Sequence, residues 1–458
     1  MPDRGSDDPR QGDPSRREFL KLGAALGVAS ALPPAAAAAR PSQSAQGTTL
    51  FAAPPMDRVR VGFVGVGGQG SVHVENFLTL DGVDVKAICD IAPEHASVNA
   101  DKVVAAGRPR PVIYDRGPRD FVRMIAEQEL DLVFTATPWE WHVPVCLEAM
   151  RNGRHAATEV PAAYTVDDCW RLVESAERER KHCVMMENCC YDQREMLMLN
   201  LVRQGLFGEL LHAECAYNHD LRSVKFSTDG EGLWRRAHAT RRNGNLYPTH
   251  GLGPIAQCLN INRGNRFDYL VSMSGASRGL QLWQEEHLAT DDPRRAERYV
   301  LGDVNTTLIR TELGQTITLV HNTNSPRPYT RINMIQGTRG LMQGWPDRIY
   351  VEGRSARPDA WEPLDTWYAQ YEHPFWRSES VRTRSVGHGG MDWLEDWRLI
   401  ACLRAGLPTD QNVYDAASWS VMCELTERSV AAKSRPMDIP DFTRGRWRVT
   451  PPLGIIEA

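Results

Sequence analysis

The chain has 458 residues, which exceeds one typical domain, so we expect two globular units. Hydrophobic residues make up 42% of the chain and charged residues 24%, which is ordinary for a protein with a substantial core. The formal net charge is −5, and the sequence contains no basic run that could follow a nucleic-acid backbone. Composition and charge therefore exclude a nucleic-acid partner.

Residues 1–39 are predicted to be an export signal and not part of the fold. A twin-arginine pattern at residues 15–21 (SRREFLK) precedes a modest apolar run, and the alanines at 35–39 provide a cleavage site. The apolar run is too short and too alanine-rich for stable membrane insertion. We expect export by the twin-arginine route to the periplasm, or secretion, with a flexible leader over residues 40–57.

Residues 58–90 carry the pattern of a dinucleotide-binding site. An apolar strand leads into Gly65, Gly67 and Gly70 in the order G-x-G-x-x-G, and a helical pattern and a second strand ending at Asp90 follow. Gly65 permits the tight turn, Gly67 lets the backbone approach a pyrophosphate, and Gly70 allows close helix–strand packing. The helix amino terminus offers unpaired N–H groups to the phosphates. Because an acid at position 90 can bind ribose hydroxyls, the pattern favours NAD over NADP.

Helical and strand patterns alternate as far as Asn188. We predict helices at 93–106, 119–128, 142–150 and 165–181, and strands at 111–114, 131–137, 154–160 and 182–188. With the first two strands these predict a doubly wound parallel sheet over residues 58–188, a Rossmann domain. Ligands of such sheets lie beyond the carboxyl ends of the strands. We therefore expect residues 139–142, Glu159, Val160 and Asn188 at the edge of the cofactor.

Residues 189–458 have a different pattern and predict a substrate-binding α+β domain. Segments 210–217, 267–274, 304–312, 316–322 and 330–337 alternate polar and apolar residues, as antiparallel strands do. Helices are predicted at 195–204 and 414–432, and long polar loops around 223–232 and 283–298. We expect an open, mainly antiparallel sheet whose face closes over the nicotinamide, and an exposed face of this kind is compatible with a homo-oligomer.

The spacing of the cysteines and the absence of familiar hydrolase motifs argue against metal or serine chemistry. The ten cysteines are scattered without C-x-x-C spacing, mostly inside apolar runs, and predict buried free thiols. The adjacent pair Cys189 and Cys190 is interpreted as packing. The sequence contains no H-E-x-x-H cluster and no G-x-S-x-G elbow, so we predict no metal site and no serine nucleophile.

Several short motifs together point to one family. They are residues 64–70 (VGVGGQG), 137–142 (TPWEWH), 158–161 (TEVP), 186–188 (MEN), 244–254 (GNLYPTHGLGP), 267–273 (FDYLVSM) and 325–329 (SPRPY). Over about residues 58–445 the chain resembles the Gfo/Idh/MocA oxidoreductase superfamily. It resembles more closely glycoside hydrolase family 109, the NAD-dependent α-N-acetylgalactosaminidases. The YPTHGLGP run is the most discriminating motif, because nothing about the fold demands it.

One departure from the wider superfamily bears on the reaction. Ordinary members carry Glu-Lys-Pro after the fifth strand, and their lysine helps to deprotonate a substrate alcohol. This chain has Glu159, Val160 and Pro161 there, and valine cannot transfer a proton. A simple alcohol dehydrogenase is therefore disfavoured, whereas the resemblance to family 109 implies a valine at this position.

The resemblance implies hydrolysis of a terminal N-acetylgalactosamine, α-linked, without the usual pair of carboxylates. NAD would accept a hydride from sugar C3, and the resulting ketone would acidify the hydrogen at C2. A base would remove that hydrogen, the group at C1 would leave, water would add, and the hydride would return. Two alternatives stay open: a periplasmic NAD(P)-dependent sugar oxidoreductase of the same superfamily, and a non-catalytic protein that senses a sugar or NAD.

The resemblance also implies the site residues. We expect His250 to be the base at C2 or C3 with Tyr247 beside it, because their i, i+3 spacing places both on one side of a helical turn. Alternatively, His250 only satisfies a local backbone group. The expected sugar contacts are Tyr217, Arg235, Tyr247, Pro248, Thr249, His250 and Tyr329, with Tyr191 as a further candidate. The expected cofactor contacts are Gly65, Gly67, Gly68, Gln69, Gly70, Asp90, Trp139, Glu140, Trp141, His142, Glu159, Val160 and Asn188.

For some of these residues a structural role is the alternative. Glu159 is expected to orient the nicotinamide ribose, although packing is an open alternative. Core packing is equally an alternative for Trp139 and Trp141, and an arginine in a polar loop such as Arg235 is often only a solvated surface group.

Overall fold

A computed structural model describes residues 47–378, 381 and 388–454 of the chain. The predicted twin-arginine signal and residues 40–46 of the predicted leader lie outside these residues, so export and localisation stay predictions. The rest of the predicted flexible leader is packed against the fold, which corrects that prediction: Thr49 is buried, and its N–H donates to Thr450 at 2.8 Å. Within the described residues, no helix is long and apolar enough to cross a membrane. All ten cysteines are buried free thiols, which confirms that prediction.

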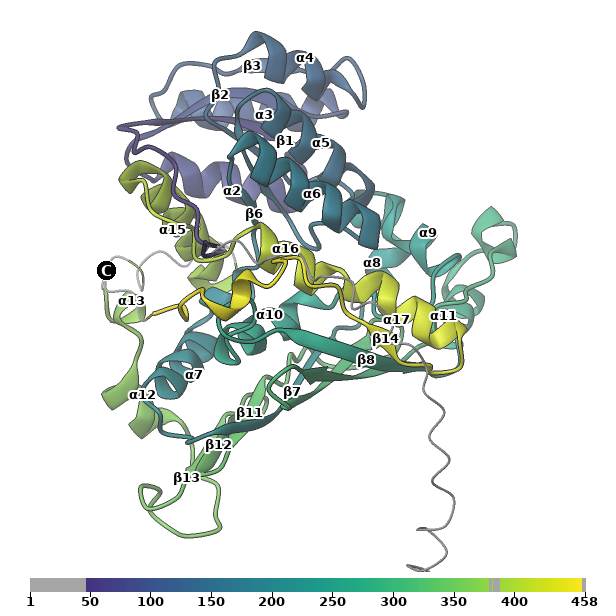
Figure 1. The fold of residues 1–458 in the computed structure, drawn as a ribbon. Helices are drawn as coiled ribbons and strands as arrows, with labels where there is room; N and C mark the ends of the chain where they lie inside the picture. Colours follow the sequence, from purple (N-terminus) through teal and green to yellow (C-terminus); the bar gives the residue numbers. More distant parts are fainter. Residues whose placement is uncertain (1–46, 379–380, 382–387, 455–458) are drawn as a thin grey trace, which may run out of the picture. The chain divides into compact units, whose positions relative to one another are not determined.

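The first half of the chain forms a six-stranded parallel sheet (Figure 1). Its strands are β1 (Val59–Val64), β2 (Val83–Cys89), β3 (Val112–Tyr114), β4 (Leu132–Thr135), β5 (His155–Thr158) and β6 (Cys183–Met185). The spatial order is β3-β2-β1-β4-β5-β6, the doubly wound order, and it reverses between β1 and β4. The predicted Rossmann sheet is confirmed, and its ligand crevice is expected at the reversal point beyond the carboxyl ends of the strands.

Five helices connect these strands and pack on the sheet (Figure 1). They are α2 (Gly68–Leu78), α3 (Pro93–Ala105), α4 (Asp120–Glu127), α5 (Trp139–Arg151) and α6 (Val166–Glu179). The side chain of Thr165 accepts a hydrogen bond from the Asp168 N–H and caps α6. Helix α5 begins at Trp139, three residues earlier than predicted, with Pro138 at its N-cap position.

The second half contains an eight-stranded sheet, and it confirms the predicted open, mainly antiparallel architecture. Its strands are β7 (Leu210–Asn218), β8 (Phe267–Ser274), β9 (Asn305–Thr311), β10 (Thr316–Asn322), β11 (Met334–Gly337), β12 (Gly340–Gln343), β13 (Arg348–Val351) and β14 (Met437–Asp438). The order is β13-β12-β11-β7-β10-β9-β8-β14, and only β7 and β10 pair in parallel. Residues of β9 alternate strictly between buried and exposed, as expected when one face packs and the other faces outward.

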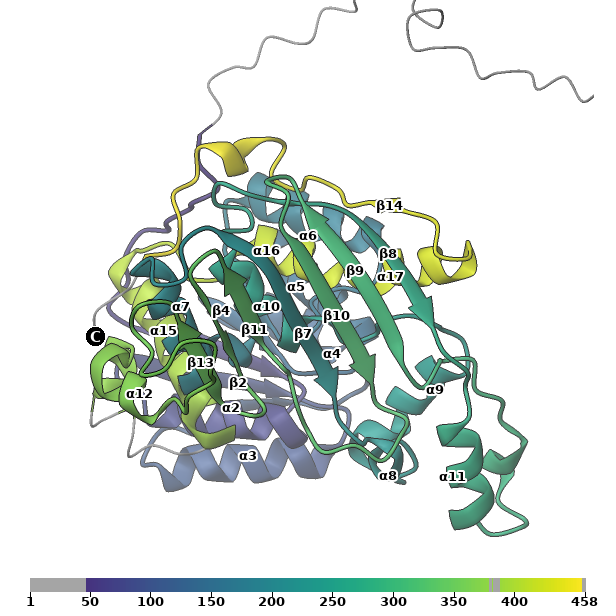
Figure 2. The ribbon, with the colours of Figure 1, turned by 90° about the horizontal axis from the view of Figure 1, so that it is seen from below.

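Helices of the second half pack on one face of this sheet, and the expectation that a sheet face closes over the nicotinamide stays a prediction. The helices of this half include α7 (Gln193–Arg203), α10 (Thr249–Cys258), α15 (Met391–Ala405), α16 (Val413–Ser420) and α17 (Met422–Ala431). Helix α10 packs on β7, α17 on β8, and α16 on α6 and β6. Figure 2 shows the opposite face of the sheet turned toward the viewer, with these helices behind it.

Several predicted elements were wrong in extent. The single helix predicted at 414–432 is two helices, α16 and α17, which meet at Val421. The predicted polar loops contain α8 (Arg222–Lys225), η2 (Gly230–Leu233), part of α11 (Gly279–His287) and η3 (Pro293–Ala296). The remaining short helices are η1 (Asn188–Tyr191), α9 (Arg235–Ala239), α12 (Asp365–Tyr371), α13 (Pro374–Arg377), η4 (His388–Gly390) and η5 (Arg446–Arg448).

Candidate active site

The glycine loop forms an anion-binding cradle at the start of α2. Gly65 has a φ of +78°, and a Cβ on Gly70 would lie 2.0 Å from the Gly65 carbonyl oxygen. A Cβ on Gly68 would meet nothing within 4 Å, so this side of the loop is open. Gly67 is the N-cap residue of α2 and has no side chain that could cap the helix. N–H groups of the first turn are therefore available to an anion. The residues present therefore fit a pyrophosphate.

Asp90 holds this loop in place at the end of β2. Its Oδ2 accepts a hydrogen bond of 2.7 Å from the Val66 N–H, and its Oδ1 accepts one of 2.8 Å from the Ala92 N–H. The carboxylate is buried among main-chain donors at the place where a ribose-binding acid is expected. Asp90 thus shapes the glycine loop, a role that sequence reasoning did not assign to it.

Replacing Gly70 by alanine should disrupt this cradle. Because the new Cβ would overlap a main-chain oxygen, we expect the free energy of unfolding to fall by roughly 3 kcal/mol, together with loss of bound dinucleotide. Urea denaturation and chromatography of the cofactor released from denatured protein measure the two effects. Gly68→Ala is the matched control, since its Cβ enters open space; equal destabilisation of both variants would contradict the argument.

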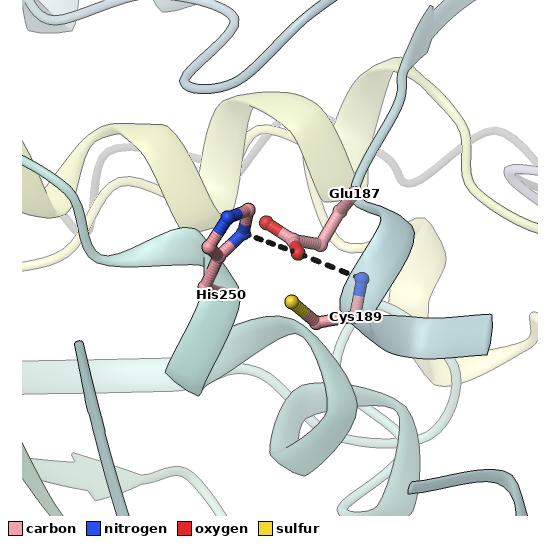
Figure 3. A group of neighbouring side chains, drawn as sticks. All are labelled: Glu187, Cys189 and His250. Carbon is pink, nitrogen blue, oxygen red and sulfur yellow. Dashed lines mark hydrogen bonds and ion pairs between the residues drawn. The ribbon is translucent and has the colours of Figure 1, made fainter. Parts of the chain in front are cut away.

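A buried carboxylate orients His250 (Figure 3). Glu187 follows β6 and is fully buried, and its Oε1 accepts a hydrogen bond of 2.8 Å from Nδ1 of His250, the second residue of α10. The Cys189 N–H also donates to this oxygen, at 3.2 Å. Burial alone would raise the pKa of the Glu187 carboxyl, but the charge and hydrogen bond of His250 outweigh burial and leave the pKa below its ordinary value. Glu187 is therefore a carboxylate.

The other ring nitrogen of His250 is left for a substrate. The His250 side chain is 14% exposed, and Nε2 makes no hydrogen bond to any described residue. When the ring is neutral and its Nδ1–H is donated to Glu187, Nε2 carries the basic lone pair. A carboxylate that holds an imidazole in this tautomer and stabilises its charged form is the arrangement of a general base. The observed partner of His250 is thus a carboxylate, and not the backbone group considered as the alternative.

Aromatic rings surround this imidazole. The ring centroid of Tyr247 lies 4.8 Å from that of His250 at an interplanar angle of 89°, and Tyr217 lies 4.6 Å from Tyr247 and 5.4 Å from His250. Tyr329 is 6.2 Å from Tyr217. Tyr247 is not on a helical turn, which corrects that expectation, because α10 begins two residues later; Pro248 is its N-cap and Thr249 its first residue. The predicted proximity of Tyr247 and His250 is nevertheless observed.

Arg235 is also part of this cluster and is not a solvated surface group. It is 7% exposed, and its guanidinium carbon lies 5.0 Å from the Tyr247 ring centroid and 5.2 Å from that of Trp139. Its Nη2 donates to Glu231 at 3.0 Å. The arginine thus lies between Tyr247 and Trp139 at the start of α5, where cation–π contacts hold the two rings together.

Other predicted site residues lie outside this cluster. The Tyr191 hydroxyl donates to Asp410 at 3.2 Å in the interior. His142 directs its two ring nitrogens at the carbonyl oxygens of Thr137 and Pro161, both at 2.8 Å, and so joins the loops after β4 and β5. Trp141 packs edge-on against Phe121. Among the described residues, the contacts of Tyr191, His142 and Trp141 are thus with the interior and with neighbouring loops.

Two further predicted residues make specific polar contacts. Glu140 lies 3.9 Å from Nε2 of His238, and this neighbouring imidazole lowers the pKa of the glutamate. The buried Val160 follows Glu159, whose Oε2 accepts a hydrogen bond from the Val160 N–H.

Helix α15 binds the glycine-loop helix through buried charges that sequence reasoning missed. His73 on α2 lies between two carboxylates, with Nδ1 2.9 Å from Asp396 and Nε2 2.8 Å from Glu159. Burial by itself lowers the pKa of His73, but the two carboxylates outweigh it and raise the pKa well above its ordinary value. His73 is thus a buried imidazolium that fixes the orientation of Glu159.

A second carboxylate of α15 joins the loop to the end of the Rossmann half. Asp392 accepts hydrogen bonds from Gln69 at 2.9 Å, Asn188 at 2.7 Å and His388 at 2.8 Å. Burial raises the pKa of Asp392, but the hydrogen bond and charge of His388 dominate and lower the pKa to about 2. One carboxylate therefore holds Gln69 and Asn188, two of the predicted cofactor contacts.

The Asp392 carboxyl should make the free energy of unfolding depend on pH in the acidic range. Because its pKa falls from 3.8 unfolded to about 2 folded, it contributes about 2 kcal/mol that is present above pH 3.8 and lost as the pH falls through 2. Asp392→Asn should therefore unfold more easily at pH 7 and converge on the parent in acid. Urea titrations over a pH series test this. The exposed Asp291→Asn is the control, with less than about 0.5 kcal/mol expected at any pH.

Fold and site together define a two-part protein with an NAD-binding Rossmann domain. Residues 59–188 match the oxidoreductase family with an NAD-binding Rossmann fold. Levoglucosan dehydrogenase in complex with NADH and levoglucosan has a similar fold. Its TM-score is 0.65 at 17% identity, over 84% of this chain and 100% of that chain. An NAD-binding oxidoreductase from Klebsiella pneumoniae gives a TM-score of 0.64 at 14% identity, over 84% and 100%.

The remainder of the chain identifies the family. Residues 191–449 match the C-terminal domain of glycosyl hydrolase 109. A glycosyl hydrolase family 109 protein from Shewanella pealeana is 47% identical, over 96% of this chain and 99% of its own. A protein from Shewanella oneidensis named alpha-N-acetylgalactosaminidase is 45% identical, over 97% and 99%. The chain belongs to glycosyl hydrolase family 109, a family of glycosidases, as the sequence motifs predicted.

Proposed function

We propose that the protein is an NAD-dependent α-N-acetylgalactosaminidase that works by oxidation, elimination, addition and reduction. The observation that carries the proposal is the Glu187–His250 pair, which presents an imidazole nitrogen beside a cluster of tyrosines. Asn188, the neighbour of Glu187, is joined through Asp392 to Gln69 of the glycine loop. The Shewanella oneidensis relative named for this activity supports the choice of substrate. The proposed cycle does not use the pair of carboxylates that most glycosidases place around the scissile bond, because it needs a base instead.

In this proposal each residue has one task. NAD, when bound, supplies reversible hydride acceptance at sugar C3. His250 Nε2 accepts the proton that leaves the C3 hydroxyl or C2, and the Glu187 carboxylate stabilises the imidazolium that results. The faces of Tyr217, Tyr247 and Tyr329 contact the sugar. Glu159, held by His73, orients the nicotinamide ribose. The buried Val160 offers no proton-transfer group, which weighs against a simple oxidoreductase.

An assay with an aryl α-N-acetylgalactosaminide in deuterated water tests the proposal. The purified protein, without added NAD, should release the aryl group, contain NAD and introduce deuterium at C2 of the sugar. Release without exchange at C2 would remove the elimination mechanism. Accumulation of NADH from free sugars would instead indicate the oxidoreductase, and neither reaction would be expected of a sensing protein.

A further inference from the structure

Three different metal-ligand side chains meet beside the proposed base. Glu187, Cys189 and His250 each offer one ligand atom, and these atoms all lie within 4.8 Å of one another. Figure 3 shows the carboxylate and the imidazole facing each other with the thiol next to them. This is the one such group of three or more among the described residues. The sequence did not predict it, because the glutamate and cysteine are 63 and 61 positions from the histidine.

The donor set fits a borderline-soft divalent cation. Zinc binds imidazole and carboxylate at about 2.0–2.2 Å and thiolate at about 2.3 Å, so tetrahedral ligands lie roughly 3.3–3.8 Å apart. The three atoms would reach these separations by shifts of at most about 1 Å. Sulfur and imidazole ligands disfavour Mg²⁺ and Ca²⁺, which require oxygen. Glu187 and Cys189 are fully buried, whereas the His250 side chain is 14% exposed and gives the three ligands their contact with solvent.

We propose that Glu187, Cys189 and His250 form an inhibitory site for Zn²⁺ and related cations. Binding would release the Cys189 thiol proton to solvent, which breaks the thiol's hydrogen bond to Asn188, and would move the His250 proton from Nδ1 to Nε2, which breaks the hydrogen bond to Glu187. Metal–sulfur, metal–nitrogen and metal–oxygen bonds would form in their place. The metal thereby takes the imidazole out of the tautomer that the base requires. Inhibition rests on the proposed function, whereas metal binding does not.

Cobalt(II) spectroscopy tests the site independently of activity. Chelator-treated full-length protein titrated with Co²⁺ should develop a thiolate-to-cobalt charge-transfer band that Zn²⁺ displaces. Loss of an outer-sphere partner typically costs 10–100-fold in metal affinity, so loss of the thiolate in Cys189→Ser should weaken binding by at least roughly 100-fold. Cys190→Ser is the matched control, because Cys190 is an equally buried neighbour outside the cluster.

The spectra test the metal site, and the glycosidase assay tests inhibition by the metal. No thiolate band in the parent protein, or a band that persists in Cys189→Ser and disappears in Cys190→Ser, would overturn the site. If Cys189→Ser does not fold, Cys189→Ala takes its place, and the parent and Cys190→Ser spectra still decide. In the glycosidase assay, Zn²⁺ should inhibit the parent and Cys190→Ser but spare Cys189→Ser. A band without any glycosidase activity would refute the proposed function and leave the metal site standing.

Discussion

Replacing Glu187 by glutamine is expected to lower kcat for aryl α-N-acetylgalactosaminide hydrolysis about 10²–10⁴-fold, with a much smaller change in KM. The amide would keep a hydrogen bond to His250 Nδ1, but it could donate as well as accept, and so would favour the tautomer with the proton on Nε2. It would also remove the negative charge that stabilises the imidazolium. Steady-state kinetics at pH 7 measure the effect.

His250→Ala should lose about as much activity as Glu187→Gln, and the double variant little more, because the two residues act as a unit. The matched control is Glu177→Gln, which removes a partly buried carboxylate on α6 that binds Arg444 and Tyr414 and shares no partner with the dyad. Its kcat should equal that of the parent. Full activity in His250→Ala would end the assignment of the base, and a loss confined to KM would assign His250 to binding.

Replacing Asp396 by asparagine is expected to lower the free energy of unfolding by about 3–5 kcal/mol and to release bound NAD. The buried imidazolium of His73 would lose its charged partner on α15, and Glu159 its fixed position beside the loop. Urea denaturation gives the stability, and the cofactor content of purified protein gives the retention. Added NAD should restore part of the activity, which loss of folding alone would not allow.

The control for Asp396 lies at the other end of the same helix. Arg404 donates to the carbonyl oxygens of Asp57 and Asp81 in exposed contacts between α15 and the Rossmann half. Arg404→Ala should cost less than about 1 kcal/mol and should leave the NAD content unchanged. Equal cofactor loss in both variants would show that any loosening of α15 releases NAD, and would refute a specific role for the His73 ion pair.

Local patterns predicted much of the fold. The glycine loop, Asp90 and the six parallel strands follow one another within 130 residues, and each strand is recognisable from its own apolar run. Helix α15 was not predicted, because its buried residues include Asp392, Glu395 and Asp396 and leave no amphipathic period. The short β12, β13 and β14 likewise lack enough residues to show an alternation.

The proximity of Tyr247 and His250 could be predicted because they are only three positions apart in the chain. The Glu187–His250 contact joins residues 63 positions apart, and the Asp396–His73 contact joins residues 323 positions apart. The sequence by itself predicts the dinucleotide loop and the candidate base, because the residues of each lie close together in the chain. Only the tertiary structure shows which carboxylates orient these groups and set their charge. Those carboxylates come from distant segments, and they pair with the buried groups because a buried charge without a partner is too costly.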